Sequence, residues 1–449
     1  MKDLLWNINH TLTLLCVFPA IVLLGSYLSF RLKFPQVTKL RLSAKYLLKK
    51  DSGAGNISHY QAMSSVLAGN FGTGNISGIA IAIGAGGPGA LVWMWIMAFF
   101  GAAIQYASCI LGVKYRTRDG KGEYSGGPMY YLEKGIKQKG LAIAFSLVTI
   151  CAAFTVGNLA QVHSISLPLK YAGIDPITTV CIITACAFLV ILGGIKRVAI
   201  VAATIVPIKA LLYLGTSLVI LFYHADLILP AFKLMLQAAF DFNSVAGGLA
   251  GFSVAQAISA GFDRGLFATD AGTGIVPILQ SSAKTSNPVV DGIVTLIAPF
   301  LVMIVCTMTG LVLIVTGACN VGLKSTDMVT YAFETGLQSS FGFYVVVVSL
   351  MLFAYTTVIA WAYCGKKAMS FIWPKGASLF QYCYIACIPI GAFLHVDLIW
   401  GLADLFISLM LIFNVIGVAL LSKQVIGDSK DYFAKEPSSS LQMGQSLTL

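Results

Sequence analysis

The chain has 449 residues, of which 57% are hydrophobic and only 10% are charged, and its mean hydropathy is +0.84. These values exclude an ordinary soluble domain and indicate a membrane protein with several spans. The net charge of +11 could suggest a nucleic-acid partner, but in a membrane protein it more simply reports loop orientation. The ten cysteines lack CxxC or metal-ligand spacing, so we interpret them as packing residues.

Apolar runs of about 20 residues predict eleven membrane spans. In chain order they cover residues 11–30, 59–84, 88–113, 141–168, 176–193, 199–222, 245–275, 289–317, 342–362, 379–395 and 398–422. Segments 229–244 and 326–341 are too polar to span, and their helical spacing predicts short amphipathic helices or plain connectors. The polar, serine-rich tail after Lys423 is expected to be disordered.

The charges of the loops predict how the chain is oriented. Loops 31–51, 114–140, 193–198, the 280s, 364–375 and the tail hold about 23 of the 29 lysines and arginines. The opposite face keeps only Lys2, Lys170, Lys233 and Lys324. Because positive loops stay in the cytoplasm, we expect an outside N terminus and a cytoplasmic C terminus. The first apolar run exceeds a usual signal-peptide core and is expected to remain as a mature span.

The second span carries four glycines and three polar residues at mid-membrane depth. They are Gly69, Asn70, Gly72, Thr73, Gly74, Asn75 and Gly78. Each glycine costs about 1 kcal/mol relative to alanine in a helix interior. The helix is therefore expected to break, with its free N–H and C=O groups facing a cavity. The alternative is close helix packing through small residues.

The seventh span echoes this pattern. Gly72-Thr73-Gly74 recurs as Gly272-Thr273-Gly274, after Gly261 and Gly265, and a second break is expected between 259 and 274. Spans two to six and seven to eleven are each five helices long, and an odd number of spans inverts the second unit. We therefore predict an all-α inverted repeat with one accessory span. Its segments would be 1–58 (accessory span and basic loop), 59–228, 229–424 (the two repeats) and 425–449 (polar tail).

The glycine-rich stretch also resembles a known family. GTGNISGIAIAIGAGGPGALVWMWIMAFFG at 72–101 is similar to the signature of the alanine or glycine:cation symporters, also called sodium:alanine symporters, of the amino acid–polyamine–cation superfamily. Further matches are GGPMYYL at 126–132, GNLAQ at 157–161, RGLFATDAG at 264–272, CTMTGLVL at 306–313, WAYCGKK at 361–367 and the run from Asp404 to Asn414. The resemblance covers nearly the whole chain.

This resemblance implies a leucine-transporter-like fold of five plus five helices. It also implies a monomeric secondary active symporter, not an enzyme, in the bacterial cytoplasmic membrane. The implied cargo is alanine, glycine or D-alanine with sodium as the coupling ion, and no organic cofactor or nucleic acid is involved.

An amino acid zwitterion inside the membrane needs a partner for each of its charges. N–H groups at a half-helix N terminus suit the carboxylate, whereas carbonyls and the Gln161 side chain could hold the ammonium. Phe267 and Trp361 would limit side-chain size. The full candidate set is Gly72, Thr73, Gly74, Asn75, Gln161, Gly261, Phe267, Thr269, Asp270 and Trp361.

Each of these assignments has a plainer alternative. Gln161 could form an interhelical hydrogen bond, and Phe267 and Trp361 could be ordinary packing residues. An Arg–Asp ion pair among Asp263, Arg264 and Asp270 could simply hold the cytoplasmic half of the seventh span together.

A sodium site would need hard oxygen donors. In FAYTTVIAW of the ninth span, Thr356 and Thr357 offer hydroxyls, and the Phe353 carbonyl lies one turn back. The resemblance adds the facing carbonyls of Ala68 and Phe71. A plain threonine pair in a membrane helix is the alternative.

Three places depart from the family pattern: His163, the ATDAG stretch and Lys209 in VPIKALLY of the sixth span. A lysine inside the membrane is a functional-site hypothesis by default. Burial favours its neutral amine, so Lys209 could exchange a proton, and in related folds a lysine replaces the sodium ion. Proton coupling is therefore the alternative to sodium. Lys209 could instead snorkel to the cytoplasmic edge.

Two other classes of function fit the sequence less well. A channel needs a continuous polar pore, whereas these polar residues cluster at one depth. A membrane enzyme needs a nucleophile–base or metal constellation, yet the five histidines are dispersed and no HExxH motif occurs.

Overall fold

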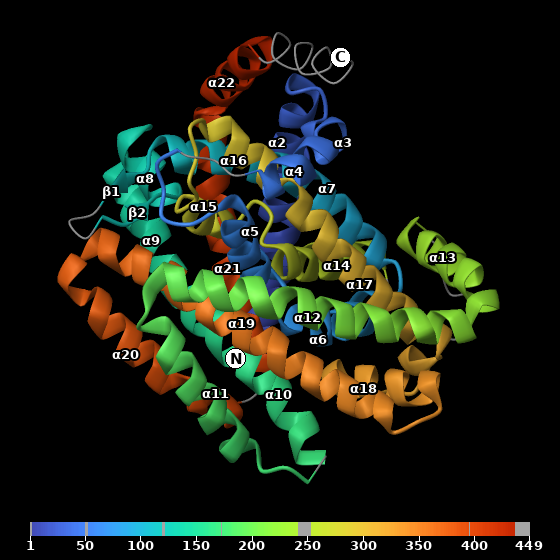
Figure 1. The fold of residues 1–449 in the computed structure, drawn as a ribbon. Coiled ribbons are helices and arrows are strands. Elements are labelled where there is room, and N and C mark those ends of the chain that lie inside the picture. The colour runs from blue at the N-terminus through green and yellow to red at the C-terminus, as the bar shows by residue number, and fades with distance from the viewer. Residues whose placement is uncertain are drawn as a thin grey trace, which may run out of the picture.

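The computed structural model describes residues 2–49, 53–118, 122–171, 173–240, 253–394 and 396–435 (Figure 1). This part of the chain is almost entirely helical. The strands β1 (Thr117–Arg118) and β2 (Tyr124–Ser125) form a small antiparallel hairpin. Seven helical segments of the described residues are long and apolar enough to cross a membrane: Leu4–Arg31, Ala90–Lys114, Lys139–Tyr171, Gly194–Tyr223, Pro288–Val315, Phe341–Ile372 and Leu398–Leu420. The total of eleven spans stays a prediction, because the broken spans consist of shorter helices.

The N-terminal unit is helical beyond its predicted span. Its elements are α1 (Lys2–Leu12), the π-helical turn η1 (Thr13–Val17), α2 (Phe18–Arg31), α3 (Pro35–Thr38) and α4 (Leu40–Leu48). The basic segment expected to be a loop therefore folds into two short helices. Phe34, at φ +52°, turns the chain, and the ring of Pro35 opens α3, where its missing N–H costs nothing.

The first predicted repeat begins with a helix in two pieces. Its elements are α5 (His59–Asn70), η2 (Thr73–Asn75), α6 (Ser77–Gly86), α7 (Ala90–Lys114), α8 (Pro128–Lys134), α9 (Lys139–Phe154), the π-helical turn η3 (Thr155–Leu159), α10 (Ala160–Tyr171), α11 (Pro176–Ile191) and α12 (Gly194–Tyr223).

The second predicted repeat also has a helix in two pieces near its start. Its elements are α13 (Ala225–Phe240), α14 (Val254–Thr269), α15 (Ile275–Gln280), α16 (Pro288–Thr295), α17 (Ile297–Val315), η4 (Ala318–Asn320), α18 (Ser325–Leu337), α19 (Phe341–Ile372), η5 (Pro374–Gly376), α20 (Ala377–Cys387), η6 (Pro389–Ala392) and α21 (Val396–Leu420). The amphipathic segments expected at 229–244 and 326–341 are helical as α13, to Phe240, and α18; residues 241–244 lie outside the described part.

Both broken helices start with a capping box. Ser58 accepts a hydrogen bond from the Gln61 N–H, and the Gln61 side chain returns one to the Ser58 N–H. Ser253 and Gln256 form the same capping box at the start of α14. Each capping box satisfies N–H groups that would otherwise be left over at a helix start.

The expectation of a disordered tail is wrong for its first part, because Ser422–Lys435 forms helix α22. This helix lies at one end of the molecule beside α3 and α4, and α10 and α18 lie at the opposite end (Figure 1). The hydroxyls of Tyr46 and Tyr432 are 2.8 Å apart, and Tyr106 and Ser429 share a buried hydrogen bond of 2.9 Å. These contacts come from distant parts of the chain, so local composition could not reveal them. We refer to these two ends as the α22 end and the α18 end.

Candidate functional site

The first helix break lies between Asn70 and Ser77 and is fully buried. The chain is extended at Gly72 and then forms one short turn, η2. A Cβ atom at Gly72 would lie 2.9 Å from both Gln161 Oε1 and Thr357 Oγ1. A Cβ at Gly74 would lie 2.5 Å from the Phe267 ring. Both glycines are therefore required because other side chains approach the backbone closely.

The second break spans Asp270 to Gly274, within the predicted interval. Asp270 has φ +51°, and Gly272 and Gly274 have φ +90° and +91°. The left-handed conformation ends α14, and α15 starts again at Ile275. The Thr269 hydroxyl donates to the Gly265 carbonyl and accepts a hydrogen bond from the Ala271 N–H.

The two breaks lie directly against each other. Asn70 Nδ2 donates to the Thr269 carbonyl at 2.6 Å. Asn75 Nδ2 donates to the carbonyls of Asn70 and Gly72, at 2.7 and 3.1 Å. Side-chain amides thus replace the helical hydrogen bonds that the break removes, which is how irregular backbone is tolerated at membrane depth.

Gln161 binds the break from the side. Its Oε1 accepts hydrogen bonds from the Thr73 N–H at 2.9 Å and the Thr73 hydroxyl at 3.1 Å, and its Nε2 donates to the Val156 carbonyl. The interhelical hydrogen bond considered as the alternative is therefore present. Gln161 occupies a backbone donor that was expected to face the substrate carboxylate, so this donor becomes available only if the Gln161 side chain moves.

For two candidates, the contacts shown are with other helical segments. Gly261 sits two turns earlier on α14, where an added Cβ would be 2.5 Å from the Ala90 carbonyl, so its role in the structure is close packing on α7. Trp361 is buried against Gly157, in the π-helical turn that precedes Gln161. Trp361 thus supports the segment that carries Gln161.

The expected sodium ligands come together, but Lys209 lies among them. Lys209 is fully buried, and its ammonium donates to the Phe71 carbonyl at 2.7 Å and to the Thr356 hydroxyl. It also lies 4.7 Å above the centre of the Phe353 ring, a cation–π contact. Snorkelling is therefore the wrong interpretation for Lys209.

The other hydroxyl and carbonyl groups of this set bind one another. The Thr356 hydroxyl donates to the Phe353 carbonyl, and the Thr357 hydroxyl donates to the Ala68 carbonyl at 2.9 Å. Two of the five expected ligands, the Phe71 carbonyl and the Thr356 hydroxyl, therefore bind a protein ammonium group, and Ala68 and Thr357 bind each other.

Two buried oxygens at the break have no hydrogen-bond partner among the described residues. They are Asn70 Oδ1 and Asp270 Oδ1. Asn70 and Thr269 are hydrogen-bonded and Asp270 follows Thr269, so both oxygens belong to the junction of the two breaks. Hard oxygens of this kind suit a small cation or the ammonium of a ligand.

Toward the α18 end, the break is covered by aromatic rings and an ion pair. Phe267 lies against Gly74 and packs on Trp400, with ring centroids 4.7 Å apart and an angle of 33° between the ring planes. Above these rings Arg264 forms a buried ion pair with Asp404 of α21. An Arg–Asp ion pair is therefore present, but the partner of Arg264 is Asp404, and Asp263 is hydrogen-bonded to Thr13 and Ser259.

Toward the α22 end, the chain before α5 is bound to the chain after α15. Residues Ala54 and Ile57 form β-bridges with Thr285 and Ala283. The Arg116 guanidinium donates to three carbonyls across this junction, those of Ser281, Ala283 and Ala54, at 2.9, 2.9 and 2.6 Å. Partial burial lowers the pKa of Arg116, but a guanidinium stays charged at neutral pH.

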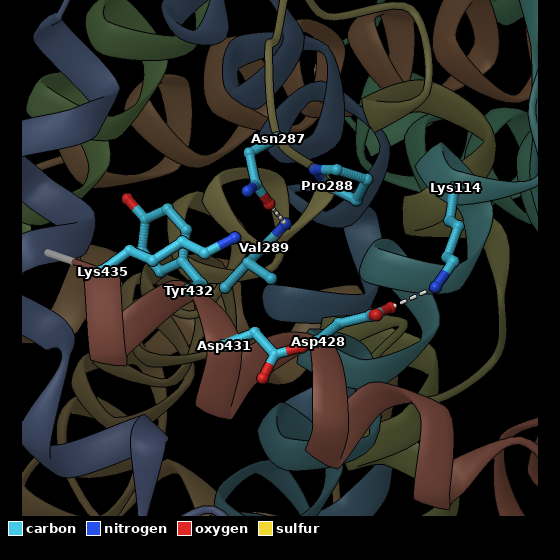
Figure 2. A pocket seen from close by; sticks show the side chains of 8 residues that line it. All are labelled: Lys114, Asn287, Pro288, Val289, Asp428, Asp431, Tyr432 and Lys435. Atoms are coloured by element: carbon cyan, nitrogen blue, oxygen red, sulfur yellow. Dashed lines mark hydrogen bonds and ion pairs between the residues drawn. The ribbon is translucent and has the colours of Figure 1, made fainter.

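A separate cavity of about 460 Å³ lies at the α22 end, between α7, α16 and α22 (Figure 2). Lys114 Nζ and Asp428 form an ion pair of 2.6 Å across it, and Asn287 caps the start of α16 through the Val289 N–H. None of the candidate residues lines this cavity. It is therefore distinct from the helix-break site.

The sequence did not single out Asp404 as the partner of Arg264, or Arg116 as a donor to main-chain carbonyls. An acidic residue within the apolar run 398–422 is a signal that could have singled out Asp404. Arg116 carries no such signal, because a basic residue at a span end is common.

Comparison with known proteins agrees with this architecture. Residues 1–445 match the model of the sodium:alanine symporter family. The chain is 38% identical to the sodium/alanine symporter AgcS of Methanococcus maripaludis, over 91% of this chain and 92% of that protein. It is 34% identical to the probable sodium/glutamine symporter GlnT of Bacillus subtilis, over 96% and 89%.

Among solved structures, MhsT in complex with L-phenylalanine is similar in fold. Its TM-score is 0.61 at 14% identity, over 84% of this chain and 92% of that one. The leucine-transporter-like fold expected from the resemblance is thus confirmed.

Proposed function

The chain belongs to the sodium:alanine symporter family, and we propose that it carries small neutral amino acids, such as alanine, D-alanine and glycine, with sodium by alternating access. The two facing helix breaks are the observation that carries this proposal. They bring together the Thr73 N–H, which is bonded to the Gln161 side chain, and the unpartnered side-chain oxygens of Asn70 and Asp270, in a buried place where a zwitterion would need partners for both charges.

The substrate carboxylate would bind the N–H groups of Thr73 and Gly74 after the Gln161 side chain moves, whereas the Asn75 N–H donates to the Gly72 carbonyl. Its ammonium would bind the carbonyls at the end of α5 and Gln161 Oε1, which is free of Thr73 once the Gln161 side chain has moved. Phe267 would cover the substrate and favour small side chains. The relative GlnT is named as a probable sodium/glutamine symporter, so glutamine is the first larger amino acid to test as a competitor.

The position of Lys209 bears on the coupling ion. An ammonium and a sodium ion would not share the space between the Phe71 carbonyl and the Thr356 hydroxyl. We therefore propose that sodium binds the side-chain oxygens of Asn70 and Asp270, next to the substrate. The Lys209 ammonium would occupy the other position permanently and connect α12 to α5 and α19.

Proton coupling is the second candidate, and the same observation favours it. If Lys209 loses its proton during transport, its contacts to Phe71 and Thr356 weaken, and α5 is released from α19. A proton carried by Lys209 would then replace the sodium ion at this position.

Alanine uptake into proteoliposomes tests the two candidates, with a sodium gradient alone and then with a proton gradient alone. We expect the sodium gradient to drive accumulation. Asp270→Asn should raise the sodium concentration for half-maximal uptake at least about tenfold, whereas Lys209→Met should leave sodium dependence intact. Accumulation driven only by the proton gradient, and lost in Lys209→Met, would instead establish proton coupling.

The orientation follows from loop charge. We propose that the α18 end is outside and the α22 end is cytoplasmic, because Lys324 precedes α18 at the former and the basic residues of α4 and α22 lie at the latter. An impermeant maleimide applied to intact cells should label a cysteine at Lys324 but not one at Lys430; the reverse pattern contradicts the proposal.

A further inference from the structure

Asn75 ends the first helix break, and every polar group of this buried residue has a partner. Its side-chain nitrogen donates to the carbonyls of Asn70 and Gly72, and its N–H donates to the Gly72 carbonyl. Its side-chain oxygen accepts from the Cys306 thiol at 3.1 Å, and its carbonyl accepts from the Thr309 hydroxyl at 2.9 Å. The last two donors belong to α17, so α17 holds the residue that closes the break.

A tyrosine of α12 extends this contact. The hydroxyls of Tyr213 and Thr309 are 2.9 Å apart, and both side chains are fully buried. The Thr309 hydroxyl has one proton for the carbonyls of Asn75 and Val305, which both lie 2.9 Å away. Tyr213 is therefore the donor in its bond to Thr309. A hydroxyl that accepts one hydrogen bond becomes a stronger donor in the next, so Tyr213 strengthens the bond to Asn75.

The position of Tyr213 is itself fixed. Its ring stacks on Phe333 of α18, with centroids 5.2 Å apart, and lies 5.8 Å from the ring of Phe353 of α19. Aromatic contacts of this kind on two sides leave the hydroxyl little freedom to move.

Tyr213 and Lys209 hold opposite sides of the break from one helix. They are four residues apart on α12 and therefore share a face. Lys209 donates to the carbonyl of Phe71, before the break, whereas Tyr213 acts through α17 on Asn75, after it. One turn of α12 thus spans the break.

We propose that Thr309 and Tyr213 are positioning residues for the substrate carboxylate. They fix Asn75, which in turn fixes the Gly72 carbonyl, so the two N–H groups between these residues keep a set direction. Both side chains act through the main chain of the break, without contact with the substrate. This inference rests on the amino acid transport proposed above, and it identifies residues outside the site that set its affinity.

The chain offers matched variants. Thr309→Val removes the hydroxyl at nearly constant shape, whereas Thr309→Ser keeps it. Tyr213→Phe removes only the donor to Thr309. Tyr106→Phe is the control, because Tyr106 is also fully buried and its hydroxyl lies 2.9 Å from that of Ser429, in the contact between α7 and α22. The two tyrosine changes therefore remove the same group at the break and at the α22 end.

Sodium-driven alanine uptake into proteoliposomes, together with the melting temperature of each purified variant, tests the inference. We expect the KM for alanine to rise at least about tenfold in Thr309→Val and at least about threefold in Tyr213→Phe, because misplaced N–H groups weaken substrate binding. The kcat should change by less than about threefold. Thr309→Ser and Tyr106→Phe should keep the wild-type KM, even if Tyr106→Phe melts at a lower temperature. The double variant should have the KM of Thr309→Val alone, because Tyr213 acts through Thr309.

A wild-type KM in both Thr309→Val and Tyr213→Phe would overturn the positioning role and leave the proposed transport intact. Equal rises of KM in Tyr213→Phe and Tyr106→Phe would show a general effect of losing a buried hydroxyl and would overturn it as well. If Thr309→Val does not fold, these two tyrosine variants decide the matter. Absence of alanine uptake by the wild type would overturn the proposed substrate and this inference together.

Discussion

At the scale of single residues, the site depends on contacts that leave no room for a larger side chain. A Cβ added at Gly72 would lie 2.9 Å from Gln161 and Thr357, and one added at Gly74 would lie 2.5 Å from Phe267. Lys209 shows the opposite requirement, because only a long cationic side chain from α12 can reach the Phe71 carbonyl and the Thr356 hydroxyl. A buried charge is tolerated where its donors find acceptors.

Two glycines of the same broken helix give a matched test. Gly74→Ala would place a Cβ 2.5 Å from the Phe267 ring, whereas at Gly69 the nearest atom would be 3.7 Å away. Overpacking of this kind costs about 1–3 kcal/mol, so Gly74→Ala should lower kcat/KM for alanine uptake at least about tenfold. Gly69→Ala should change it by less than about threefold. Equal effects of the two substitutions would contradict the close-contact argument.

At the scale of elements, one junction closes each end of the bundle, and the two junctions join different helices. The chain before α5 pairs with the chain after α15, and Arg116 connects them. At the other end, α14 is joined to α21 through Arg264 and Asp404. Alternating access would require these two junctions to open in turn.

Arg116 should therefore control access from the α22 end. Replacement by alanine removes three hydrogen bonds to main-chain carbonyls and should favour opening there. In a background without the ten native cysteines, we expect maleimide to label Ala283→Cys at least about tenfold faster when Arg116→Ala is added.

Arg116→Lys is the control for charge. A lysine keeps the positive charge but lacks the planar fork that reaches several acceptors, so its labelling rate should be intermediate. Identical rates for wild type, Arg116→Lys and Arg116→Ala would show that Arg116 does not hold this end closed.

At the scale of the whole molecule, α22 ties the end of the chain to its beginning. Its residues contact α4 and α7 through Tyr46, Tyr106 and Lys114. The Lys114–Asp428 pair is about one-third exposed and contributes little by itself. The buried Tyr106–Ser429 hydrogen bond matters more, because its loss leaves a buried hydroxyl without a partner.

Truncation tests this role. A chain ending at Leu421 should lose roughly 1–3 kcal/mol of unfolding free energy and melt several degrees lower in detergent. A chain ending at Lys435 keeps α22 and should melt like the full chain. If both truncated chains melt at the same temperature, α22 makes no contribution to stability.

The membrane class, the position of both helix breaks and the family could all be predicted from the sequence alone. Each rests on local composition: glycines between apolar runs weaken a helix wherever the rest of the chain lies, and a motif needs only its own residues. Partner choice could not be predicted in this way. Arg264 meets Asp404 across 140 residues, Lys209 meets Phe71 across 138, and Arg116 meets Ser281 across 165. Only helix packing brings such groups together, so the tertiary structure alone placed Lys209 among the expected sodium ligands and folded the tail into α22.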